Sequence, residues 1–118
     1  MTRLKLALAA VAAFALLAVP TAPAKTVLRG TVGPGFTISL KTASGQRVKT
    51  LRHGTYTIRV ADKSDFHNFH LRGPGVNKKI TTVGFEGTKT ITVRLVKGRY
   101  TYVCDPHRTS MKGSFRVT

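Results

Sequence analysis

Three side chains that can bind a soft metal ion lie close together near the end of the chain. Cys104, His107 and Met111 have the spacing C-x2-H-x3-M, and Cys104 is the only cysteine. Met111 is the only methionine besides Met1. A thiolate, an imidazole and a thioether together select copper among the common metal ions. Each residue alone is more often structural, so it is their occurrence together in one eight-residue segment that predicts a copper site.

A copper site of this kind needs a second histidine from another part of the chain. Two histidines, His67 and His70, lie in the segment 66–72, which is expected to form a strand. Alternation along a strand puts residues 67, 69 and 71 on one face and residue 70 on the other. Phe69 and Leu71 are expected core residues, so we expect His67 to be the ligand and His70 to lie at the surface. Whether His70 replaces or assists His67 stays open.

The elements that must position these residues are expected to be β-strands. After Lys25 the chain has no sustained helical period, only short alternating runs separated by Gly, Pro and Asp. The expected strands are 25–32, 36–41, 55–61, 66–72, 89–95, 99–104 and 113–117, with positions 100, 102 and 104 pointing inward. Many short strands with regular turn signals predict an all-β sandwich or barrel of antiparallel strands. Pro106 then forces a turn directly after the strand that ends at Cys104.

The first 24 residues have the features of a cleaved signal peptide. Arg3 and Lys5 precede an apolar run at residues 6–19, and residues 22–24 form the small-x-small pattern of a cleavage site after Ala24. The apolar run is shorter than the roughly 20 residues that a membrane-spanning helix needs. We therefore expect a periplasmic or secreted protein, with a signal peptide at 1–24 and one domain at 25–118.

The charge of the chain is strongly positive. Arg3 and Lys5 account for two of the 20 basic residues, which leaves 18 against four acidic ones, a formal net charge of about +14. Such a field accelerates encounter with anionic partners. We expect an acidic redox protein as partner, or peripheral contact with an anionic envelope, and we expect neither nucleic acid binding nor a transmembrane segment in the mature chain. One cysteine permits no intramolecular disulfide, and the mature protein is expected to be monomeric.

The two segments that carry the candidate ligands, at residues 67–68 and 104–113, resemble one family. His67-Asn68, together with Cys104-Asp105-Pro106-His107 and a following Met111-Lys112-Gly113, resembles the plastocyanin, pseudoazurin and amicyanin group of cupredoxins. The resemblance covers nearly the whole chain after residue 24. It implies a Greek-key β-sandwich with one copper ion at one end, bound by His67, Cys104, His107 and Met111.

The resemblance also implies roles for residues around the metal. Asn68 would join the two ligand segments by hydrogen bonds near the cysteine, and Asp105 stands where relatives carry Ser or Thr. Electrons would leave through the exposed edge of His107, framed by an apolar patch. Candidates for the patch, which would dock a partner, are Phe36, Pro106 and Pro74, with the alternative that Phe36 belongs to the core.

These features favour a blue-copper electron carrier that cycles between Cu(I) and Cu(II). A periplasmic copper buffer or delivery protein would use the same ligands and is the alternative. An enzyme is disfavoured, because no second acid–base constellation is evident and a small domain offers little substrate cleft. A plain envelope-binding β-sandwich would explain the charge but not the Cys-His-Met segment.

Overall fold

Nine β-strands and one short 3₁₀ turn make up the regular structure of the described residues. The computed structural model describes residues 2, 7, 9–18 and 26–118. The elements are β1 (Thr26–Val32), β2 (Ile38–Thr42), β3 (Thr50–Leu51), β4 (Gly54–Asp62), β5 (Phe69–Gly73), β6 (Val76–Thr81), β7 (Gly87–Leu95), β8 (Gly98–Val103), η1 (Asp105–His107) and β9 (Lys112–Val117). The expected cleavage point between Ala24 and Lys25 lies outside the described residues. Within the described part of the chain, no helix has the length and apolar character needed to cross a membrane.

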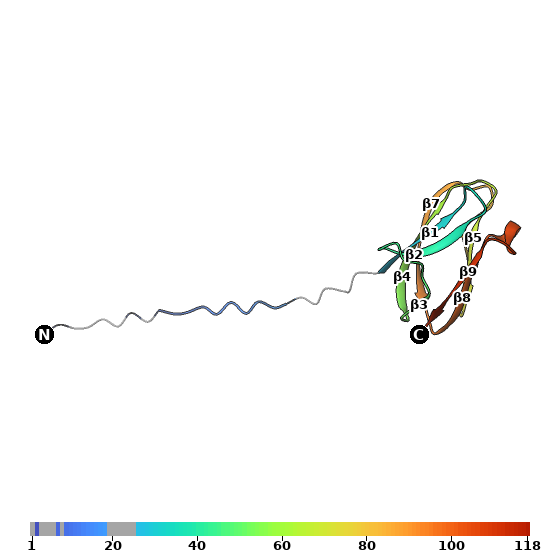
Figure 1. Cartoon of the computed structure of the whole chain (residues 1–118). Helices are drawn as coiled ribbons and strands as arrows, with labels where there is room; N and C mark the ends of the chain where they lie inside the picture. Colours follow the sequence, from blue (N-terminus) through green and yellow to red (C-terminus); the bar gives the residue numbers. More distant parts are fainter. Residues whose placement is uncertain (1, 3–6, 8, 19–25) are drawn as a thin grey trace.

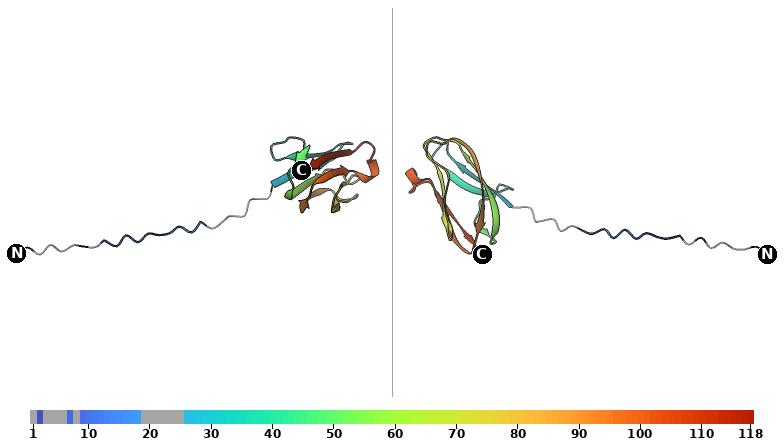
Figure 2. Two further views of the ribbon diagram at one scale, coloured as in Figure 1. Left: turned by 90° about the horizontal axis from the view of Figure 1, so that it is seen from below. Right: turned by 180° about the vertical axis from the view of Figure 1, so that it is seen from behind.

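The strands form two sheets that face one another. One sheet has the order β2-β1-β4-β7 and the other β3-β9-β8-β5-β6. Figures 1 and 2 show the η1 turn at one end of this sandwich and the C-terminus at the other. We call these the η1 end and the C-terminal end. The prediction of an all-β sandwich is therefore confirmed.

The expectation that all strands pair antiparallel is wrong at two places. β1 pairs with β4 in parallel, with Leu28 beside Ile58, and β3 pairs with β9 in parallel. β1 runs toward the η1 end, and the chain returns through β2 and crosses to the other sheet before β4 starts again at the C-terminal end. The alternation of apolar side chains is the same in parallel and antiparallel strands, so the sequence pattern did not reveal the direction.

Two strands were not expected, and β5 begins three residues later than expected. β3 has only two residues, and β6 contains the polar run at residues 77–79, so neither gives a clear alternating signal. β5 begins at Phe69 and not at Phe66, because residues 65–68 turn the chain before it enters the sheet. This turn decides where His67 lies.

The core between the sheets is built on stacked aromatic rings. Phe69 of β5 stacks on Tyr102 of β8 with ring centroids 5.4 Å apart, and Tyr100 stacks on Phe115 of β9 at 5.3 Å. Tyr100, Tyr102 and Cys104 are fully buried, which confirms the inward face expected for this strand. The large buried area of these rings stabilises the packing of β5, β8 and β9 that leads to Cys104.

The stacked tyrosines lie directly over glycines of the neighbouring strands. Tyr102 pairs with Gly113 and its ring occupies the space that a side chain at Gly113 would need. In the same way, the Tyr100 ring covers the backbone of Gly73. Both glycines are required because the rings need close approach to the backbone.

We expect Gly113→Ala to destabilise the apoprotein by about 1–3 kcal/mol, because the new methyl group would overlap the Tyr102 ring in a packed core. Gly35→Ala is the matched control, since a Cβ at Gly35 meets no atom within 4 Å. The measurement is chemical unfolding of both variants without metal. Equal stability of the two variants would contradict the packing described here.

Candidate copper site

A tight loop between β8 and β9 carries Cys104, His107 and Met111. Pro106 lies in the first turn of η1, where its fixed φ suits the bend. The backbone N–H of His107 donates to the Cys104 carbonyl at 3.0 Å, and that of Met111 donates to the His107 carbonyl at 2.8 Å. The N–H of Cys104 donates to the Met111 carbonyl at 3.0 Å. These hydrogen bonds fold the loop back on itself, so that its two ends meet.

His67 reaches the same point from the turn before β5. Its Nδ1 lies 3.6 Å from Sγ of Cys104, and Nδ1 of His107 lies 3.6 Å from the same sulfur. The ligand atoms of these three residues all lie within 4.8 Å of one another. Met111 is fully buried in the same loop. The structure thus brings together the three predicted nitrogen and sulfur donors, from segments 37 residues apart.

The donor set fits copper. Two imidazole nitrogens and one thiol sulfur around a common point are the three strong ligands of a mononuclear copper–thiolate site, and a thioether is its usual weak axial ligand. Cys104 is fully buried and His67 is fully buried, so a metal there would be shielded from solvent. His107 is partly exposed and would be the ligand at the surface. A hard ion such as Mg²⁺ would instead require oxygen ligands.

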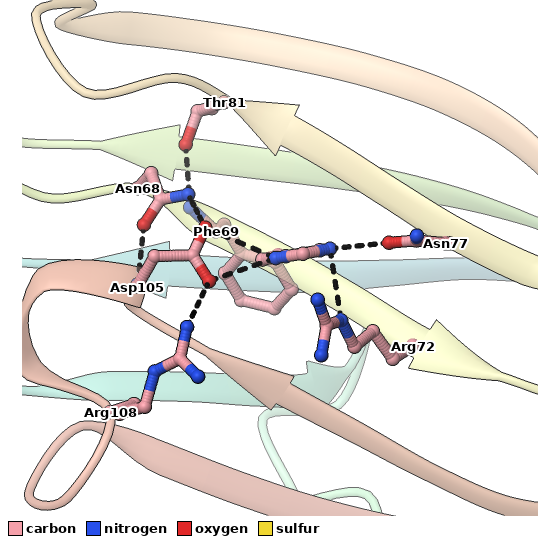
Figure 3. Close-up of polar contacts among 8 residues, drawn as sticks. Asn68, Phe69, Arg72, Asn77, Thr81, Asp105 and Arg108 are labelled. Atoms are coloured by element: carbon pink, nitrogen blue, oxygen red, sulfur yellow. Dashed lines mark hydrogen bonds and ion pairs between the residues drawn. The ribbon is translucent and has the colours of Figure 1, made fainter.

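Asn68 and Asp105 join the two ligand segments directly. The side-chain amide of Asn68 donates to Oδ2 of Asp105 at 2.7 Å, and the backbone N–H of Asp105 donates to Oδ1 of Asn68 at 2.7 Å (Figure 3). Next to Asn68, the N–H of Phe69 donates to the Thr81 hydroxyl at 2.9 Å. Asn68 directly follows His67, and Asp105 directly follows Cys104, so the Asn68–Asp105 pair fixes His67 relative to Cys104.

The prediction that His70 lies at the surface is wrong. The residue is 2 % exposed, and its Nδ1 lies 2.9 Å from Oδ1 of Asp105. It points away from the metal donors, as alternation requires. However, the side chains of Asp105, Asn77 and Arg72 cover this outer face of the sheet (Figure 3). The sequence showed the direction of His70 but not the residues above it.

The surface around His107 is apolar and aromatic. The Phe36 ring lies 4.9 Å from the His107 ring and is 63 % exposed, so the alternative that it belongs to the core is wrong. Phe66 lies 4.4 Å from the His67 ring and is half exposed. Pro106 is also exposed. Phe66 was missed because it was placed inside a strand, although its position beside the histidine ligand candidate was visible in the sequence.

Pro74 does not lie near this patch. Its carbonyl accepts a hydrogen bond from the Tyr100 hydroxyl at 3.0 Å, and its ring lies against Gly98, at the start of β8. Cys104 follows the other end of β8, so Pro74 lies at the C-terminal end of the sandwich. β5 begins next to His67 and runs away from the η1 end. The turn at residues 73–75, which follows β5, therefore lies at the C-terminal end, and this is why the prediction for Pro74 is wrong.

Asp105 is an anion held inside this arrangement. Partial burial alone would raise the pKa of its carboxyl, but hydrogen bonds from His70 and Asn68 outweigh this, and the pKa lies below the ordinary value. Arg108 adds a positive charge, with its guanidinium 3.6 Å from Oδ1. The site therefore carries a fixed negative charge one residue after Cys104.

Comparisons with known proteins agree with this geometry. The family of copper-binding proteins described as plastocyanin/azurin matches residues 36–118. No curated protein matches the sequence. Among solved structures, a rusticyanin methionine-to-glutamine variant is 22 % identical with a TM-score of 0.55, and covers 78 % of this chain and 76 % of its own.

Two further structures share the fold. Reduced rusticyanin is 24 % identical with a TM-score of 0.52 and covers 78 % of each chain. A chain from a heme-copper terminal oxidase dimer is 17 % identical with a TM-score of 0.53, and covers 78 % of this chain and 63 % of that one. The family match spans well over half of the sequence and includes the whole Cys-His-Met loop. This chain therefore belongs to the plastocyanin/azurin family of copper-binding proteins, the cupredoxins, and its cofactor is one copper ion in the sandwich domain.

Proposed function

We infer that this protein is an exported blue-copper electron carrier whose metal is held by His67, Cys104, His107 and Met111. The observation that carries this proposal is the thiol sulfur of Cys104 with Nδ1 of His67 and Nδ1 of His107 each 3.6 Å away. When bound there, copper accepts and releases one electron at a time. The deprotonated thiol of Cys104 would be its strongest ligand.

The protein scaffold supports rapid electron transfer by holding the donors in place. Cys104 is anchored through its backbone to Met111, and His67 is anchored through the Asn68–Asp105 pair. Since both segments rest on the stacked rings of the core, the donors need little movement when the charge of the site changes. Slow transfer would follow if these anchors were loose.

His107 is the proposed exit for the electron. It is partly exposed beside Phe36, and the exposed side chains of Phe66 and Pro106 extend the same apolar patch. An acidic redox protein would dock there, guided by the positive charge of the domain. In this proposal the mature protein is a monomer and has no catalytic role of its own.

We expect one equivalent of Cu(II) to give the apoprotein an intense blue thiolate-to-copper absorption band. Cys104→Ser should abolish the band, and His67→Ala or His107→Ala should abolish or strongly alter it, because each removes a strong ligand. His53→Ala is the control, since this exposed histidine binds the Thr118 carbonyl at the C-terminal end. Optical and EPR titrations measure the result, and a colourless complex that Cys104→Ser leaves unchanged would disprove the assignment.

Electron transfer to an acidic redox protein should slow as ionic strength rises, because exposed charges are screened within about 10 Å at 0.1 M salt. Lys112→Glu, at the start of β9, should slow the transfer more than Lys97→Glu. Lys97 is also exposed but lies between β7 and β8 at the C-terminal end. Stopped-flow kinetics measures these transfer rates.

Electron self-exchange separates the electron carrier from a copper buffer. Slow self-exchange by the copper protein would favour the buffer.

Export predicts a defined mature N-terminus. Protein recovered from outside the cytoplasm should begin at Lys25, because the small-x-small pattern directs cleavage after Ala24. Intact-mass spectrometry measures this directly. Ala24→Leu is the matched variant that should block or shift the cleavage, and a protein that retains Met1 in the mature fraction would refute the export proposal.

A further inference from the structure

The carboxylate of Asp105 is held from several sides beside the ligand loop. Asn68 donates to Oδ2 at 2.7 Å, and Nδ1 of His70 lies 2.9 Å from Oδ1 and 3.1 Å from Oδ2. Arg108 approaches Oδ1 from the exposed side at 3.6 Å. An ionised carboxylate only accepts hydrogen bonds, so Nδ1 of His70 must carry the proton and donate.

His70 is itself held in place from behind. Its Nε2 lies 2.6 Å from the side-chain oxygen of Asn77 and 3.3 Å from Nε of Arg72 (Figure 3). In the sheet, His70 is paired with Val103, the residue directly before Cys104. With its ring buried and bound at both nitrogens, His70 cannot turn away from Asp105 without losing buried hydrogen bonds.

The bonds that Asp105 makes with Asn68 and with His70 have different consequences. The backbone N–H of Asp105 donates to Oδ1 of Asn68 and ties the loop to the His67 segment, whereas the bond from His70 acts only on the carboxylate. Without His70, only Asn68 still holds the carboxylate, at Oδ2, and Oδ1 can turn toward the exposed guanidinium of Arg108 and solvent, where its charge is screened. An anion kept near a metal stabilises the more highly charged Cu(II) relative to Cu(I).

We propose that His70 is a positioning residue which holds the Asp105 carboxylate against the ligand loop and thereby lowers the reduction potential of the copper site. The proposal rests on the blue-copper function inferred above. His70 is buried and is not one of the four proposed copper ligands, so this role is separate from metal binding. The residue acts through Asp105 alone.

Two substitutions at position 70 separate this role from simple packing. The amide nitrogen of Asn can take the place of ring Nδ1, whereas that of Gln takes the place of Nε2. His70→Asn should therefore keep the donor to Asp105 and a near wild-type potential. His70→Gln keeps the contact to Asn77 and should raise the potential, while retaining the blue band.

Asp105→Asn should raise the reduction potential more than His70→Gln, because it removes the negative charge itself. In the Asp105→Asn background, His70→Gln should cause no further shift, since the two residues act in series. Cyclic voltammetry or redox titration of the four proteins measures this. Equal potentials of wild type and His70→Gln, with the blue band intact, would overturn the proposal and leave the electron-carrier function standing.

The contact can also be tested without metal. In the apoprotein, a double-mutant cycle of His70→Gln and Asp105→Asn should show a non-additive change in unfolding free energy, because the two side chains touch. Additive effects would overturn the proposal whether or not the protein binds copper. If His70→Gln fails to fold, Asn77→Ala takes its place, because Asn77 is exposed and contacts Nε2 of His70. We expect this variant to raise the reduction potential by less. An unchanged potential would contradict the role of Asn77 in holding His70.

Discussion

Two hydrogen bonds between Asn68 and Asp105 are the constraint on which the metal site depends. The donors come from chain segments 37 residues apart, and each segment alone presents only part of the site. The amide of Asn68 satisfies both the carboxylate and the backbone N–H of Asp105, so neither segment can shift without leaving buried polar groups unpaired. This pair sets the distance between His67 and Cys104 before any metal is bound.

The core explains why such a small pair can hold the site. Phe69 follows Asn68 directly and stacks on Tyr102, which lies two residues before Cys104. Tyr102 in turn covers Gly113, two residues after Met111. The aromatic packing therefore runs beneath both ligand segments, and the close approach permitted by glycine keeps β8 and β9 in contact. The aromatic packing in the core and the Asn68–Asp105 hydrogen bonds together restrict the movement of the donor side chains.

Charge is distributed unevenly over the described residues. Asp62 and Asp105 are buried or partly buried, so Asp65 and Glu86 are the exposed carboxylates of the domain. The ion pairs within the described residues both involve Asp105. Most cations therefore face solvent without an acidic neighbour, so the domain carries a positive field around the apolar surface at His107.

The sequence alone determined the chemistry of this protein. A single cysteine, one histidine and one methionine within eight residues predicted a soft metal site before the fold was known, because ligand preference depends on the donor atoms. The alternating apolar pattern likewise predicted an all-β sandwich or barrel, of which the resemblance to cupredoxins implied the sandwich, and it gave the inward face of residues 100, 102 and 104. Local patterns carry this information because side chains alternate along every strand.

Only the tertiary structure decided what lies beside each residue. Strand direction decided that Pro74 is at the end opposite the metal site, and the turn before β5 decided that Phe66 flanks His67. Two partners of His70 are Asn77 of β6 and Asp105, the residue after Cys104, and no local pattern brings these segments together. Alternation fixes which way a side chain points, but long-range pairing fixes what it meets, and that depends on the register of strands far apart in the chain.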